Sequence, residues 1–131
     1  MRLPALLLVG VGLLLAGCAS HPARVPPRVV PTGSVVEGLA SWYGPGYDGK
    51  RTSSGERFDQ DALTAAHYDW AFGTRVEVTL LSTGKSVVVR INDRLPRRDR
   101  IIDVSRGAAR AIGLIGPGTG RVRLRVIGEG P

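Results

Sequence analysis

Short apolar segments broken by glycine and proline run through most of this 131-residue chain, and they allow few folds. Between residues 35 and 127, apolar and polar residues alternate over short stretches, with the period of a half-buried β-strand. The 18 glycines and 9 prolines interrupt these stretches before a long amphipathic helix can form. Because a chain of this length supports one hydrophobic core, the sequence predicts a single, mainly β domain.

The clearest strands form a hairpin. Over residues 75–81, Val76, Val78 and Leu80 face one side, and the turn 82–84 leads into a second strand over residues 85–92. We expect further strands over residues 35–43, 101–104 and 121–127. Together these strands predict a compact β-barrel.

Two short helices complete the predicted fold. Ser105 is a residue type that caps helix starts and Gly113 one that ends helices, so we expect a helix over residues 106–112. Residues 61–66 favour one further helical turn. Asp103 precedes the cap, and we interpret it as favouring the start of this helix.

The first 34 residues are typical of an export signal and a spacer. Arg2, an apolar run over residues 6–15 and the small residues before Cys18 resemble a bacterial lipoprotein signal. The run is shorter than the roughly 20 residues of a membrane-spanning helix, although an uncleaved anchor helix stays an alternative. The resemblance implies a signal peptide over residues 1–17, lipidation of Cys18 and a proline-rich tether over residues 18–34, ahead of a domain over residues 35–128 and a tail over 129–131.

Several familiar chemistries lack their residues in this sequence. One cysteine and two histidines cannot form a His/Cys metal cluster, and the glycine-rich stretch 116–120 has no phosphate-binding lysine. No serine stands in a strained nucleophile turn. We therefore expect no metal and no cofactor.

Four titratable residues remain as candidates for chemistry: Glu56, His67, Asp93 and Asp103. Asp93 ends an apolar strand, and a carboxyl group partly removed from water there can hold a proton that glycosidic cleavage needs. Each of these residues also has a structural explanation, as a surface loop charge, a core histidine or a solvated turn pair. Residue types alone leave both explanations open.

Five ordered segments between residues 38 and 105 resemble the motifs of the RlpA family of rare lipoproteins. They are Gly38-Leu39-Ala40-Ser41-Trp42-Tyr43-Gly44, Thr52-Ser53-Ser54-Gly55-Glu56, Leu63-Thr64-Ala65-Ala66-His67, Asn92-Asp93-Arg94 and Arg100-Ile101-Ile102-Asp103-Val104-Ser105. The resemblance implies a six-stranded double-psi β-barrel with one or two short helices. It also implies an endolytic lytic transglycosylase that cleaves MurNAc-GlcNAc strands of peptidoglycan and leaves 1,6-anhydro-MurNAc ends.

The resemblance further implies which residues act. It places Asp93, Glu56 and His67 in the active-site cluster. Because Asp93 lies beside the apolar strand, we expect it to be the acid, although the sequence leaves the division of roles between Asp93 and Glu56 open. We expect the substrate-binding residues to be Trp42, Tyr43, Thr52 and Arg94. The aromatic residues, including Tyr47, can stack on sugar rings or pack in the core, and Arg94 can bind a substrate carboxylate or pair with Asp93; the sequence leaves these alternatives open.

Leu95 departs from the family pattern, which has glycine at this position. If that glycine serves a positive φ or a close approach of the sugar, Leu95 would reshape the groove. Residues 68–71 and 97–100 also differ from the usual sequences. These departures concern the groove more than the barrel.

The net charge of +7 suggests a second class of function. Arginines at positions 97, 98, 100, 121, 123 and 125 either form a basic face for anionic envelope polymers or lipid head groups, or are scattered and solvated. A non-catalytic, expansin-like peptidoglycan-binding lipoprotein is therefore the alternative function. We expect a monomer with no nucleic-acid partner, anchored in the cell envelope through Cys18. Ala19 favours, by resemblance, the outer membrane facing the periplasm.

Overall fold

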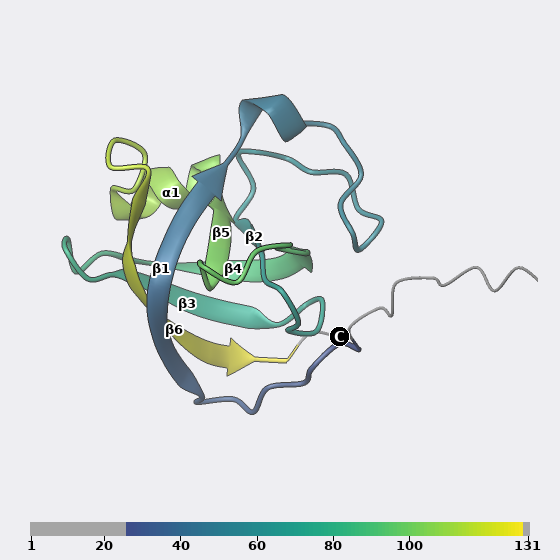
Figure 1. Cartoon of the computed structure of the whole chain (residues 1–131), viewed down its shortest axis with the longest axis horizontal. Coiled ribbons are helices and arrows are strands. Elements are labelled where there is room, and N and C mark those ends of the chain that lie inside the picture. The colour runs from purple at the N-terminus through teal and green to yellow at the C-terminus, as the bar shows by residue number, and fades with distance from the viewer. Residues whose placement is uncertain (1–25, 130–131) are drawn as a thin grey trace, which may run out of the picture.

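A computed structural model describes residues 26–129 and shows a closed six-stranded barrel (Figure 1). In chain order the elements are β1 (Val35–Tyr43), the 3-10 turn η1 (Pro45–Tyr47), β2 (Thr64–Ala66), β3 (Arg75–Leu80), β4 (Ser86–Asp93), β5 (Ile102–Ser105), α1 (Arg106–Ile112) and β6 (Thr119–Gly128). The strands close in the order β1-β5-β2-β4-β3-β6. The predicted mainly β barrel with a short helix over residues 106–112 is confirmed, whereas the 3-10 turn η1 lies in a segment where the sequence predicted no helix.

Both parallel and antiparallel pairs occur in the barrel. β3 pairs antiparallel with β4 and β6, and β6 also pairs antiparallel with β1. β1 and β5 are parallel, as are β2 and β4. In Figure 1, β1 is a long curved strand that crosses the barrel, with α1 beside its upper end and the long connection after η1 projecting at the upper right.

Alternation along the strands builds the core. In β3 the side chains of Val76, Val78 and Leu80 are buried, while those between them are partly exposed, as the sequence predicts. β6 repeats this pattern with Val122, Leu124 and Val126. Helix α1 adds three buried side chains, at positions 108, 109 and 112.

The ends of α1 follow the capping prediction. Ser105 accepts a hydrogen bond from the Ala108 N–H at 3.2 Å, and Gly113 ends the helix in the left-handed conformation at φ 82°. Asp103 takes no part in this cap. It lies in β5, where it bonds Arg100 and Ser41, so its interpretation as a helix-starting residue is wrong.

Residues 61–66 do not form the predicted helical turn. Thr64, Ala65 and Ala66 instead form strand β2, which lies between β4 and β5. All three residues are buried, so the segment lacks the alternation that marks a half-exposed strand. Two flanking strands supply its hydrogen bonds, and this long-range pairing overrides the local preference.

The end of the predicted tether lies against the barrel. Arg28 forms a β-bridge with Trp70, Val30 is buried in the core, and the Gly33 N–H donates to the Val126 carbonyl at 2.7 Å. We call residues 26–34 the docked segment. The predicted signal peptide and Cys18 lie outside the described residues. Within residues 26–129, no helix combines the length and the hydrophobicity needed to cross a membrane.

Candidate active site

A hollow of about 210 Å³ opens beside the end of β4. It is lined by Tyr43, Tyr47, Ala66, Asp93, Arg94, Leu95, Pro96 and Asp103. A larger hollow of about 600 Å³ adjoins it and shares the wall 94–96, but its lining includes no acidic residue. Because acid catalysis near neutral pH is commonly carried out by a carboxyl group, we assign the chemistry to the smaller hollow, which we call the carboxyl hollow.

Asp93 is held by its backbone neighbours at the end of β4. Its Oδ1 accepts hydrogen bonds from the N–H groups of Ser53 at 3.0 Å and Arg94 at 2.8 Å. Its Oδ2 lies 3.4 Å from the hydroxyl of Tyr43. Two donors therefore occupy Oδ1, and Oδ2 is the oxygen available for a proton or a ligand.

Tyr43 covers Asp93 from the end of β1. Its ring stacks on Phe58 at 4.4 Å and meets the edge of Tyr47 at 5.6 Å. Burial, together with the charges of Asp93 and Asp103, raises the pKa of the Tyr43 hydroxyl well above its usual value. Tyr43 therefore stays protonated and acts as a hydrogen-bond donor in this hollow.

Glu56 stands apart from the carboxyl hollow and is clamped by two side chains. Arg90 donates to both of its oxygens, at 2.9 and 3.0 Å, and Asn92 Nδ2 donates to Oε1 at 2.6 Å. These hydrogen bonds lower the pKa of Glu56, so it is a carboxylate at neutral pH. Its loop also carries Ser53, whose N–H holds Asp93.

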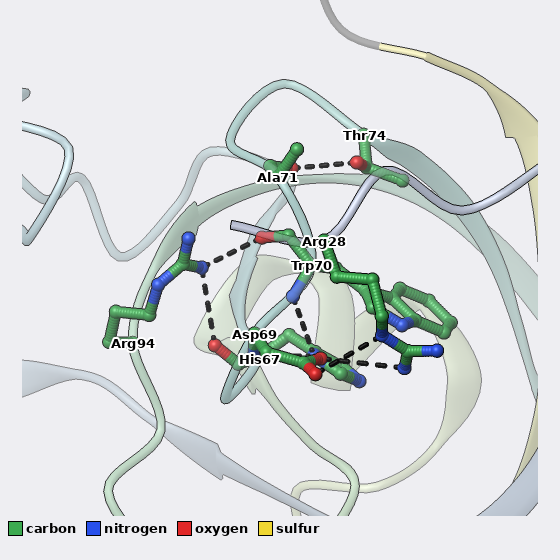
Figure 2. Close-up of polar contacts among 7 residues, drawn as sticks. All are labelled: Arg28, His67, Asp69, Trp70, Ala71, Thr74 and Arg94. Atoms are coloured by element: carbon green, nitrogen blue, oxygen red, sulfur yellow. Dashed lines mark hydrogen bonds and ion pairs between the residues drawn. The ribbon is translucent and has the colours of Figure 1, made fainter. Parts of the chain in front are cut away.

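His67 is buried, 1% exposed, and stacks on Trp70 with the ring centroids 4.2 Å apart. Its Nδ1 accepts the N–H groups of Asp69 and Trp70, both at 3.2 Å (Figure 2). Burial lowers the pKa of His67 to about 4, and the charge of Asp69 only partly opposes this. The 3.5 Å separation of Nδ1 from Asp69 Oδ1 is therefore no ion pair at neutral pH, and the proton resides on Nε2.

The Arg94 side chain does not pair with Asp93. Its Nη1 donates to the carbonyl of Trp70 at 2.8 Å and lies 3.4 Å from that of His67 (Figure 2). Its guanidinium lies 3.9 Å above the Phe72 ring. Burial lowers the pKa of Arg94. Its neighbour Leu95 is 4% exposed, and among residues 26–129 every residue at positive φ is a glycine. Leucine therefore stands here without backbone strain.

The structure brings only some of the predicted site residues to the carboxyl hollow. Tyr43, Asp93 and Arg94 line it, together with Tyr47. Trp42 instead packs against the core, and the Thr52 hydroxyl donates to the Glu56 carbonyl at 2.8 Å inside its own loop. Cys18 lies outside the described residues.

Sequence reasoning named Asp103 as a candidate but interpreted it as a helix-starting residue, and it missed Ser53. Asp103 lines the carboxyl hollow from β5, and the Ser53 N–H fixes Asp93 from the loop ahead of Glu56. The spacing of Arg100 and Asp103 signals an ion pair three residues apart, whereas a backbone donor leaves no sequence signal. Within residues 26–129, no three side chains of histidine, cysteine, aspartate or glutamate gather as a metal site would require.

Comparison with known sequences identifies relatives of this chain. The family described as lytic transglycolase matches residues 35–124. A probable endolytic peptidoglycan transglycosylase RlpA of Synechocystis is 62% identical over 91 residues, which are 69% of this chain and 28% of the relative. The endolytic peptidoglycan transglycosylase RlpA of Campylobacter jejuni is 52% identical over 105 residues, 79% of this chain and 38% of the relative. The chain thus spans well under half the length of either relative.

Solved structures share the fold at lower identity. A Streptomyces papain inhibitor superposes with a TM-score of 0.63 at 21% identity, covering 76% of this chain and 99% of the inhibitor. A Clavibacter michiganensis expansin superposes with a TM-score of 0.61 at 21% identity, covering 75% of this chain and 52% of the expansin. At this level of identity the likeness shows the fold alone, so it confirms the double-psi barrel and carries no activity to this chain. The match to the lytic transglycolase family and the identity with its RlpA members establish that this chain belongs to the RlpA family.

Proposed function

We propose that this chain is an endolytic transglycosylase that cleaves the MurNAc-GlcNAc bonds of peptidoglycan strands. The observation that carries the proposal is the geometry of Asp93, which lines the carboxyl hollow with Oδ1 fixed by two N–H groups and Oδ2 contacted only by the Tyr43 hydroxyl among the described residues. The RlpA relatives named as endolytic peptidoglycan transglycosylases support the choice of reaction and substrate.

In the proposed reaction, Asp93 gives one proton to the substrate and then takes one back from it. Protonated at Oδ2, it donates to the oxygen that bridges MurNAc to GlcNAc, and the bond from the anomeric carbon to that oxygen breaks. The C6 hydroxyl of the same MurNAc then bonds to the anomeric carbon and gives its proton to Asp93. The products are a GlcNAc hydroxyl and a 1,6-anhydro-MurNAc end, and no water is consumed.

Glu56 and His67 support Asp93 from outside the carboxyl hollow. Glu56 ties its loop to Arg90 and Asn92, which keeps the Ser53 N–H on Asp93. The backbone N–H of His67 donates to the Asp93 carbonyl at 3.2 Å, and this bond holds the end of β2 against the end of β4. Thr52 fixes the same loop as Glu56, while the rings of Tyr43 and Tyr47 offer surfaces on which a sugar can stack.

The place of action is the cell envelope. Cys18, if lipidated, anchors the chain to a membrane, and the outer membrane facing the periplasm fits Ala19. The basic-face alternative has less support, because Arg97, Arg100 and Arg123 each form an ion pair with a neighbouring carboxylate. The glycan strand is therefore the partner we assign.

Digestion of purified sacculi tests the proposed function. Wild-type protein should release fragments with 1,6-anhydro-MurNAc ends, detected by mass spectrometry, and Asp93→Asn should lower their rate of release by about 100-fold or more, since general acid catalysis contributes that much. Glu37→Gln is the matched control, because Glu37 is an ion-paired carboxylate on β1 outside the hollow. This control should retain wild-type activity.

The same experiment separates the enzyme from the non-catalytic alternative. A wild-type protein that sediments with sacculi and releases no soluble fragments is a binding protein, and the transglycosylase proposal is then wrong. Fragments with reducing ends in place of anhydro ends would show hydrolysis by water instead.

A further inference from the structure

Two carboxyl groups line the carboxyl hollow, those of Asp93 and Asp103, and the proposed reaction uses only Asp93. Ala66 on β2 is the Cα partner of Asp93 on β4 and also of Asp103 on β5. Neighbouring strands lie about 4.8 Å apart, so the Cα atoms of the two aspartates are about 10 Å apart in one row of the sheet. Residues paired in this way point to the same face, and both aspartates line the hollow.

Asp103 is fixed in an orientation that its neighbours determine. Ser41 Oγ donates to its Oδ1 at 2.5 Å, and Arg100 donates to both oxygens, at 2.8 and 3.0 Å. The hydrogen bonds from Arg100 to Asp103 raise the pKa of Arg100, which keeps the guanidinium charged. The two hydrogen bonds from Arg100 hold the Asp103 carboxyl group in place as an acceptor.

One acceptor position of Asp103 is left over. A carboxylate has about four lone-pair positions, and Ser41 and Arg100 together occupy three of them among the described residues. Two of these bonds are at Oδ1 and one is at Oδ2, so the remaining position is on Oδ2. The side chain is 14% exposed and lines the hollow opposite Asp93, with the small side chain of Ala66 between them.

We propose that Asp103 is a substrate-binding residue, which accepts one hydrogen bond at Oδ2 from a hydroxyl or N-acetyl N–H group of the sugar in the carboxyl hollow. The proposal rests on the proposed function for the identity of the sugar. Asp103 then holds the ring from β5 while Asp93 meets the bridging oxygen from β4. Ser41 and Arg100 are positioning residues, because they reach the sugar only through Asp103.

Binding to an inactive protein tests this role. In the Asp93→Asn background, a soluble tetrasaccharide of alternating GlcNAc and MurNAc is titrated by calorimetry. Adding Asp103→Asn should weaken its Kd about tenfold, the effect of losing a hydrogen bond to a charged acceptor. Adding Glu37→Gln, which removes an ion-paired carboxylate outside the hollow, should leave the Kd unchanged. An unchanged Kd for Asp103→Asn overturns the proposal.

A second measurement avoids any loss of folding in the variant. In Asp93→Asn protein that retains Asp103, the carboxyl carbon resonance of Asp103 should shift during the titration while that of Glu37 stays in place. A bound sugar that leaves the Asp103 resonance unmoved also overturns the proposal. Failure of the proposed function looks different, because the wild type then forms no anhydro ends while the effect of Asp103 on the Kd remains.

Discussion

Burial determines the chemical role that His67 can take. Its ring lies between Tyr68 and Trp70, and its Nδ1 is occupied by two backbone N–H groups of its own loop. A histidine that is neutral at physiological pH and already bonded at one nitrogen is suited to holding a loop in place, and it is poorly suited to proton transfer. The backbone N–H of His67 donates to the Asp93 carbonyl. Under the proposed function, we therefore expect His67 to position Asp93.

The neutral state of His67 predicts a pH-dependent stability. The pKa of His67 falls from 6.5 in the unfolded chain to about 4 in the folded protein, so the unfolded state binds the proton first as the pH drops. The stabilisation is complete above about pH 6.5 and is lost towards pH 4, a change of about 3 kcal/mol. Urea unfolding should show wild-type protein losing about this much more than His67→Gln over that range.

The comparison with His67→Gln removes the contribution of other groups. The pKa of Glu56 is also lowered, so Glu56 adds a loss of stability in acid, but it is present in both proteins and titrates below its usual value of 4.5. Parallel stability curves for the two proteins between pH 6.5 and pH 5 would contradict the assignment to His67.

Helix α1 is short, and its first turn depends on the loop over residues 59–62. Ser105 Oγ donates to the Ala62 carbonyl at 2.5 Å while it caps the helix, and the Gly107 N–H donates to the Gln60 carbonyl at 2.8 Å. The loop approaches so closely that a Cβ atom on Gly107 would lie 2.5 Å from the Asp61 carbonyl oxygen. Backbone, and not a movable side chain, fills this space.

This close approach predicts that α1 tolerates no side chain at position 107. Gly107→Ala should lower the free energy of unfolding by about 1–3 kcal/mol, since either the helix or the loop must move. Gly116→Ala is the matched control, because a Cβ there meets no atom within 4 Å and its φ is negative or extended. Chemical denaturation measures both variants, and equal stability for the two would show that the loop yields without cost.

The docked segment extends the domain beyond the barrel strands. Arg28 donates to the Asp69 carboxylate and forms a β-bridge with Trp70, in the loop that carries His67 (Figure 2). Val30 is buried in the core. The segment also supplies part of the wall of the larger hollow, through Pro26 and Pro27. Residues that the sequence suggests are a spacer therefore stabilise the loop beside the site.

Substitution of two neighbouring valines tests how much the docked segment contributes to the free energy of unfolding. Val30 is 6% exposed and Val29 is 65% exposed. Val30→Ala should lower the free energy of unfolding by about 1.5 kcal/mol, the value of the buried carbon atoms removed, while Val29→Ala should change it little. Thermal or urea unfolding of the full chain provides the measurement. Two equally stable variants would mean that the segment is only loosely attached.

Local pattern determined most of the barrel in advance. Alternation located β1, β3, β4 and β6, and a capping serine and a terminal glycine bounded α1, because these signals depend on neighbours along the chain. Motif resemblance correctly indicated the RlpA family and the double-psi barrel.

Other features depend on residues that are distant in sequence. Strand β2 forms because β4 and β5 on either side supply its hydrogen bonds. Residues 26–34 are held in place because Arg28 pairs with Trp70 and Val30 packs in the core. The same holds for the site, where Asp93 and Asp103 share one row only through Ala66. The sequence alone determined the fold class and the candidate acid, whereas the tertiary structure decided which side chains share the hollow, because closing the barrel creates contacts that no local pattern encodes.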